Sequence, residues 1–165
     1  MTDKKETRRA HEAWQRPAVN LVIDLFAQRG WNAVESPLES SIAKKLWWGG
    51  PSKLLVGPSK ANVWVVREKK EYVTPFSLSE TWDDWRADRP HLVVLVGWEL
   101  TEEVVWFIDN KAIWEIFGTA IDREIENMWM QSGEFEPVHI SRGAMADVLE
   151  PFRENYNVVK KSLFL

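Results

Sequence analysis

HLVVLVGWELTEEVVWFIDN, at residues 91–110, is the clearest indication of the fold in this chain. Residues 92–96 and 104–108 are two short apolar runs, rich in β-branched side chains and without a polar face. Such runs are typical of strands that are buried on both sides of a sheet. Because the polar link at 99–103 is short, the two runs predict a β-hairpin. We expect this hairpin to form the centre of a sheet that the other segments cover.

The segments before the hairpin predict further helices and strands. Apolar residues at helical spacing predict a helix that begins at Pro17 and ends at Gly30, and a short strand follows at 31–35, with Trp31 and Ala33 on one face. The apolar runs at 53–56 and 62–67 predict two strands joined by the turn sequence GPSK. Capping and proline signals also predict helices at 37–48 and 77–86.

The segments after the hairpin predict two helices. One covers 110–131, and the other covers 144–156 with a bend at Pro151. This mixture of elements predicts the α/β class, with a mixed central β-sheet flanked by helices. We expect a single domain at 17–165, preceded by a polar N-terminal segment at 1–16.

The composition excludes several classes of protein. With 165 residues, 45% of them hydrophobic and 28% charged, the chain is typical of a globular protein. It contains no cysteine, which excludes disulfides, thiolate metal sites and cysteine nucleophiles and fits a reducing compartment. No apolar run approaches the ~20 residues needed to span a bilayer, and the charged N-terminus lacks the apolar core of a signal peptide. We expect a cytoplasmic protein that does not enter a membrane.

Common catalytic and cofactor motifs are absent from the sequence. It has no G-x-S-x-G nucleophile elbow, no phosphate-binding G-x-x-x-x-G-K-[ST] and no G-x-G-x-x-G after a strand. The three histidines, His11, His91 and His139, are isolated and lack the i, i+4 spacing of a metal site. The sequence therefore predicts neither a resident metal nor an organic cofactor.

Several pieces of the chain, in their order, carry a resemblance to a known family. They read LFAQRGWNAVES at 25–36, KLLVG at 53–57, NVWVVREKK at 62–70 and HLVVLV at 91–96, and later EEVVWFIDN and HISRGAMADVLEPF. This series resembles the core of the PD-(D/E)xK nuclease-like family, also called the restriction-endonuclease-like fold. The resemblance implies a helix, a three-stranded meander, a crossover helix and a fourth strand. It also implies a site where two carboxylates and a lysine on adjacent strands work with Mg²⁺.

The chain departs from the family's pattern at that site. The first carboxylate would open the strand at 53–56, where the chain has Ser52 and Lys53, and the E-x-K pair would fall on Trp64 and Val66. No Asp or Glu occurs between residues 40 and 67. Because Mg²⁺ prefers oxygen ligands such as carboxylates, we expect a degenerate active site without a metal.

A shifted alignment leaves an alternative open. Glu68, Lys69 and Lys70 form a literal E-x-K, and Glu39 could supply the other carboxylate. Under this alternative the chain is an active Mg²⁺-dependent DNA endonuclease with Glu39, Glu68 and Lys70 as its catalytic residues. Helix capping explains Glu39 more simply, and a solvated strand end explains Glu68 more simply. We therefore favour a protein that is not an enzyme.

The distribution of charge suggests a partner. Residues 40–70 contain seven Lys or Arg and one Glu, whereas 71–135 contain four Lys or Arg and fourteen Asp or Glu. A basic segment inside an acidic protein is either a solvated face or a site for an anionic partner. Another alternative is a phage or host-defence protein-interaction module whose acidic half is the contact surface. The favoured hypothesis is a non-catalytic nuclease-like domain that binds nucleic acid or a protein partner.

The predicted nucleic-acid-binding residues combine the cations of the basic segment with its two adjacent tryptophans. Lysine and arginine contact phosphates, and tryptophan can stack on bases. The predicted residues are Lys44, Lys45, Trp47, Trp48, Lys53, Lys60, Arg67 and Lys69.

Overall fold

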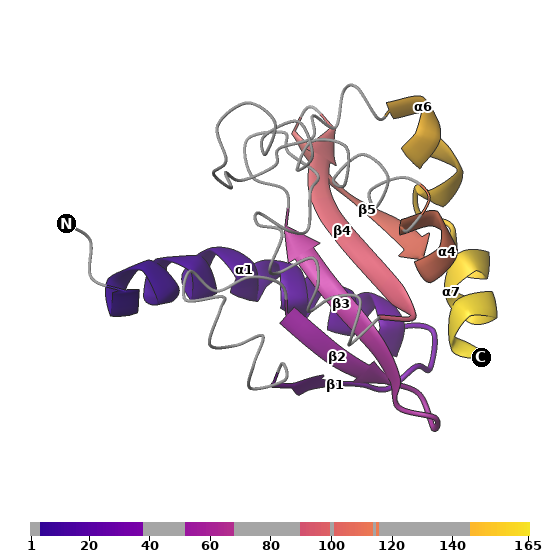
Figure 1. Ribbon diagram of the computed structural model, residues 1–165, viewed down its shortest axis with the longest axis horizontal. Helices are drawn as coiled ribbons and strands as arrows, with labels where there is room; N and C mark the ends of the chain where they lie inside the picture. The colour runs from indigo at the N-terminus through magenta and orange to yellow at the C-terminus, as the bar shows by residue number, and fades with distance from the viewer. Residues whose placement is uncertain (1–3, 38–51, 68–89, 100, 114, 116–145) are drawn as a thin grey trace, which may run out of the picture.

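The computed structural model describes residues 4–37, 52–67, 90–99, 101–113, 115 and 146–165. Five strands of these residues form one mixed sheet in the order β1-β2-β3-β4-β5 (Figure 1). The strands are β1 (Ala33–Ser36), β2 (Ser52–Val56), β3 (Ala61–Arg67), β4 (Leu92–Glu99) and β5 (Glu102–Asp109). The helices are α1 (Lys4–Ala27), α4 (Asn110–Ile113), α6 (Ala146–Leu149), the 3-10 turn η3 (Glu150–Phe152) and α7 (Tyr156–Leu163). The α/β class and the mixed sheet are confirmed.

The pairing of the strands has two parts. Strands β1, β2 and β3 form an antiparallel meander, and β4 pairs with β3 in parallel. Because parallel neighbours need a crossover connection, the chain between β3 and β4 must return to the end of the sheet where β3 begins. Strand β5 then folds back on β4 in the predicted hairpin, with Val94 opposite Phe107.

The predicted hairpin is confirmed, but its predicted place at the centre of the sheet is wrong. Strand β3 is central, and β5 is the last strand of the order. The apolar run of β5 is nevertheless buried, because α4, η3 and α7 pack against the strand. A fully apolar run indicates that a strand is buried on both faces. Both a central strand and a covered edge strand are buried in this way, so the run does not indicate the position of the strand in the sheet.

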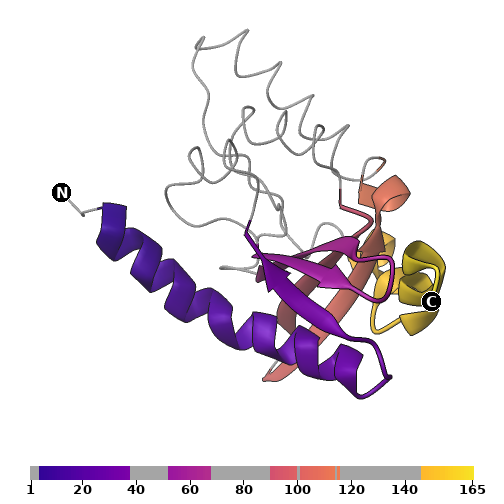
Figure 2. The same ribbon diagram turned by 90° about the horizontal axis from the view of Figure 1, so that it is seen from below.

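The core lies between one face of the sheet and the helices α1 and α7. Alternate residues of β2 to β5 point to this face and pack against Val19, Val22 and Phe26 of α1 and against Val159 and Leu163 of α7. Figure 2 shows α1 running along the sheet and extending beyond it at its N-terminal end. The shared face predicted for Trp31 and Ala33 is confirmed, since both residues pack on this core.

The start of α1 differs from the prediction. The helix begins at Lys4 and contains Pro17 in its interior, whereas the sequence predicted a helix that begins at Pro17. An interior proline costs about 3 kcal/mol or more, and contacts on its N-terminal side offset that cost. The amide of Gln15 donates to the carbonyl of Val65 at 2.8 Å, and the Arg16 guanidinium binds Glu35 of β1.

The end of the chain also differs from the prediction of one helix at 144–156. Helix α6 and η3 end at Phe152, Arg153 forms a β-bridge with Trp106 of β5, and α7 begins at Tyr156. The side chain of Asn155 caps α7 by accepting from the N–H of Asn157. This N-cap was the available sequence signal. The helices predicted at 37–48 and 77–86, and the predicted helix at 110–131 beyond Ile113, lie outside the described residues.

Candidate nucleic-acid interface

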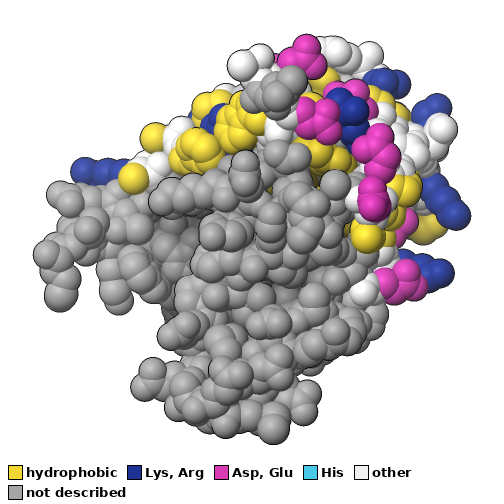
Figure 3. Space-filling view, turned by 90° about the horizontal axis from the view of Figure 1, so that it is seen from above, with side chains coloured by type: hydrophobic (Ala, Val, Ile, Leu, Met, Phe, Trp, Pro, Cys, Tyr) yellow, Lys and Arg dark blue, Asp and Glu magenta, His cyan; other side chains and the backbone are white. Residues whose placement is uncertain are grey.

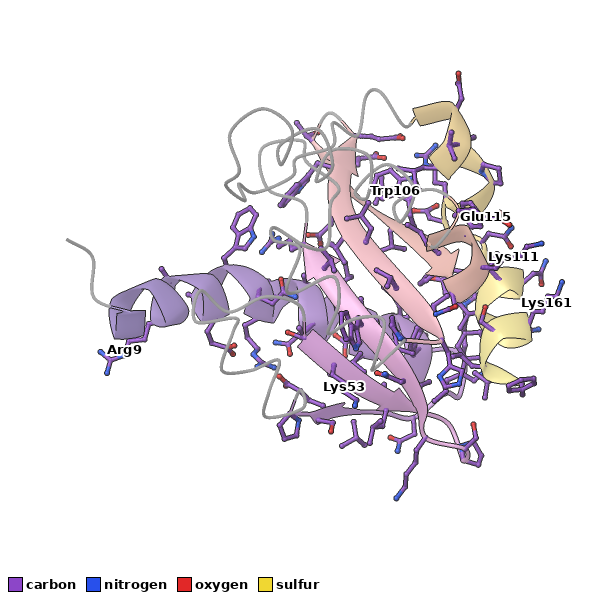
Figure 4. All side chains as sticks on the ribbon, in the orientation of Figure 1. Arg9, Lys53, Trp106, Lys111, Glu115 and Lys161 are labelled. Atoms are coloured by element: carbon purple, nitrogen blue, oxygen red, sulfur yellow. The ribbon has the colours of Figure 1, made fainter. Side chains whose placement is uncertain are left out.

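Three of the predicted nucleic-acid-binding residues are described, and they do not share a face. Lys53 pairs in register with Trp64, which places it on the face of the sheet opposite α1 (Figure 4). Arg67 lies on the α1 face, beside Trp14. Lys60 is exposed in the β2–β3 turn, at the other end of β3. The other five predicted residues lie outside the described residues, so binding by the basic segment stays a prediction.

Arg67 is enclosed by groups of its own chain. Its guanidinium carbon lies 4.3 Å from the ring centroid of Trp14 and 4.7 Å from that of Trp98. The same guanidinium donates to the carbonyl of Trp14 and lies 3.6 Å from the Glu103 carboxylate. With the side chain only 12% exposed, these contacts bind α1 to the ends of β3, β4 and β5. We call Trp14, Arg67, Trp98 and Glu103 the arginine clamp.

The arginine clamp is a feature that the sequence did not reveal. Its two tryptophans lie 5.8 Å apart between ring centroids, yet 84 positions separate them in the chain. Cation–π contacts of this kind stabilise a fold by about 0.5–2 kcal/mol each. A phosphate ligand would have to displace Glu103 and the Trp14 carbonyl, so the position of Arg67 indicates a structural role.

Two further arginines are engaged by carboxylates. Arg16 binds Glu12 and Glu35, each at 2.6 Å, and Arg153 binds Glu99 at 2.7 Å. The hydrogen bonds that Arg16 donates, first to Glu35 and then to Glu12, raise its pKa above the ordinary arginine value. As far as the titration of Arg16 is concerned, this contribution to stability is fully present below the ordinary arginine pKa and is lost only in strong alkali. In Figure 3, basic and acidic side chains of the described residues lie next to one another on the part of this face that is not grey.

In the described structure, β2 and β3 have no carboxylates at the positions where a nuclease site would need them. Lys53 of β2 lies opposite Trp64 of β3, and Ser52 lies opposite Val65. At the two predicted E-x-K positions, Trp64 is fully buried and Val66 is half-buried, and neither side chain carries an oxygen that could bind a metal. Within the described part of the chain, no group of three His, Asp or Glu could hold a metal ion. Glu39, Glu68 and Lys70 lie outside it, so the catalytic alternative stays a prediction.

Comparisons of this chain with protein-family models, with curated proteins and with solved structures find no match. The functional assignment therefore depends on the chain's own residues. Among the helices of the described residues, none has both the length and the apolar character needed to cross a membrane.

Proposed function

We propose that this chain is a non-catalytic, nuclease-like domain that binds nucleic acid. The observation that carries the proposal is the order of the elements. A helix precedes the antiparallel meander β1-β2-β3, and a crossover connection leads to β4, which is parallel to β3. The core that the sequence resembles has this order of elements, with a helix in the crossover.

The residues at the ends of β2 and β3 support the non-catalytic part of the proposal. A Mg²⁺-dependent nuclease needs carboxylates on adjacent strands that face the same metal. The corresponding positions here hold Lys53 on β2, opposite Trp64 on β3, and Val66, which lies on the same face of β3 as Trp64. An indole and a valine supply no hard oxygen ligand, and the ammonium group of Lys53 would repel a divalent cation.

The charge of the chain supports the choice of nucleic acid as the partner. Residues 40–70 carry seven basic residues and one acidic residue in a chain whose net charge is −4. Positive charge concentrated in one segment of an acidic protein attracts a polyanion to that segment, without non-specific binding over the whole surface. Arg67 belongs to the arginine clamp, so the lysines of this segment are the expected phosphate contacts.

A plasmid assay with Mn²⁺ tests the proposal. We expect the protein to retard plasmid DNA at low salt without nicking it, and we expect Lys44→Glu/Lys45→Glu to weaken the retardation. The binding should fall steeply with salt, because lysine and arginine side chains that neutralise phosphates release the counterions condensed on the DNA.

Two other outcomes would replace the proposal. Mn²⁺-dependent nicking that disappears in both Glu68→Ala and Lys70→Ala would establish the endonuclease alternative with Glu39 as the remaining carboxylate. No retardation even at low salt would leave the protein-interaction alternative, in which residues 71–135 are the contact surface.

A further inference from the structure

Helix α7 has one buried face and one basic, exposed face. Val159 and Leu163 are fully buried in the core. The exposed residues of the same helix and its C-cap are Asn157, Lys160, Lys161 and Phe164. Both lysines lie in the last turn of α7, and the N–H of the C-cap Phe164 donates to the Lys160 carbonyl, so the ring and the two lysines lie at the same end of the helix.

Lys60 lies close to this face although it is distant in the sequence. Leu165 packs so closely on Gly57 that a Cβ at residue 57 would lie 2.9 Å from the leucine Cδ2. Gly57 begins the turn that ends in Lys60, whose N–H donates to the Gly57 carbonyl at 3.1 Å. The contact of Leu165 therefore brings the end of α7 to the β2–β3 turn, as Figure 1 also shows.

The three lysines are available to a partner. Within the described residues, Lys60, Lys160 and Lys161 form no ion pair, in contrast to Arg16, Arg67 and Arg153. Lysine is a strongly hydrated point charge on a flexible stem, which suits contact with phosphates.

Phe164 is presented to solvent at an energetic cost. Its side chain is 86% exposed, the highest value among the large apolar residues described. Its backbone is left-handed, with φ at 57°, a conformation that costs a bulky residue roughly 1–2 kcal/mol. The Leu165 N–H, which donates to the Lys160 carbonyl at 2.9 Å, holds it there. The left-handed residue caps the end of the helix, and the ring that it carries stays in solvent.

We propose that Lys60, Lys160, Lys161 and Phe164, here called the α7 face, bind single-stranded nucleic acid. The ammonium groups contact phosphates along the strand, and a base stacks on the exposed ring of Phe164. The inference rests on the proposed function for the class of partner. It adds a site that residues 40–70 do not contain, apart from Lys60, and it specifies unpaired bases.

The isolation of the aromatic ring favours a single strand over a lipid surface. A helix that lies in a membrane interface buries a broad apolar face, whereas the exposed face of α7 has one apolar side chain among polar ones. One exposed ring flanked by cations is sufficient for stacking on a base, because every base has a π-face. Duplex DNA, whose bases are already stacked, would gain the phosphate contacts alone.

Fluorescence anisotropy with a short labelled oligodeoxythymidine at low salt tests the inference. We expect Phe164→Leu to weaken binding about fivefold or more, since stacking contributes about 1–3 kcal/mol per base. Leucine retains the apolar surface and removes the π-face. Lys161→Glu should weaken binding and lower the log–log salt slope by about 0.7. Arg9→Glu is the matched charge control, because Arg9 lies at the far end of the molecule from Lys161 (Figure 4).

The outcomes separate this inference from the proposed function. If Lys44→Glu/Lys45→Glu abolishes binding while Phe164→Leu and Lys161→Glu match Arg9→Glu, the α7 face is not a site and the proposed function stands. If the oligonucleotide does not bind at all at low salt, the inference is wrong, and retardation of plasmid DNA decides separately whether the proposed function stands. Equal affinity of the wild type and the Phe164→Leu variant, combined with sedimentation on anionic phosphatidylserine vesicles, would replace the inference with a lipid-binding face. Thermal melting of each variant verifies that the fold is retained.

Discussion

At the end of the sheet where α1 meets β3, Arg16 and Arg67 each contact a carboxylate, and Arg67 also lies against two indoles. On the exposed face of α7, Lys160 and Lys161 have no such partner among the described residues. The two regions differ in the residue type as well as in the pairing. A guanidinium is planar, weakly hydrated and able to stack, whereas an ammonium group is compact and strongly hydrated. The comparison indicates that the arginines stabilise the fold and that the lysines are left for a partner.

Arg67→Ala should produce the largest change in the stability of the fold. We expect it to lower the free energy of unfolding by about 2–4 kcal/mol, because it removes a charge-assisted hydrogen bond and two cation–π contacts from a buried site. Urea denaturation measures the loss. Lys161→Ala is the control and should stay within about 0.5 kcal/mol of the wild type. Equal losses in the two variants would remove the distinction between the two regions.

Gly57→Ala should lower the free energy of unfolding by a smaller amount. This variant tests whether the contact of Leu165 with Gly57 holds the end of α7 in place. Both Gly57 and Gly30 have left-handed backbones, with φ at 74° and 77°. An added Cβ meets Leu165 at Gly57 and meets nothing within 4 Å at Gly30. We expect both variants to lose about 1 kcal/mol from the backbone conformation, with a further loss in Gly57→Ala alone. Thermal unfolding curves that coincide for the two variants would mean that Leu165 does not anchor the end of α7.

Phe164→Gly should change stability in the opposite direction. Glycine adopts the left-handed conformation at a helix C-terminus without strain, so we expect a gain of about 0.5–1 kcal/mol in the free energy of unfolding. The same variant should bind the oligonucleotide more weakly than the wild type. Phe164→Ala is the control for lost stacking, because it removes the ring and keeps the strained backbone. A destabilised Phe164→Gly protein would show that the ring itself contributes to the fold.

The sequence predicted the strands and their faces well, because each depends on local alternation and composition. Residues 92–96 and 104–108 form the predicted hairpin, and 53–56 and 62–67 form the predicted antiparallel pair. The order of the strands was harder to predict from the sequence, because an apolar run such as 104–108 is equally compatible with a central strand and with a covered edge strand. Pro17 misled the prediction of α1 because the stabilising contacts of Gln15 and Arg16 come from distant strands.

The candidate sites were predictable only in part. The basic composition of 40–70 drew attention to Lys60, but nothing local placed Lys60 beside the end of α7. That proximity follows from the packing of Leu165 on Gly57. Arg67 was predicted to contact nucleic acid by charge alone, and its enclosure by Trp14 and Trp98 requires three segments that lie far apart in the sequence.

The salt dependence of oligonucleotide binding in two matched double variants distinguishes arginines that stabilise the fold from lysines that contact phosphates. Lys160→Gln/Lys161→Gln and Arg16→Gln/Arg153→Gln each remove two positive charges from exposed or partly exposed side chains. We expect the lysine variant to lose about 0.7 from the log–log slope for each phosphate contact removed. The arginine variant should keep the wild-type slope, because its charges are already neutralised by Glu35 and Glu99. Equal slopes in the two variants, or a loss confined to the arginine variant, would contradict the account.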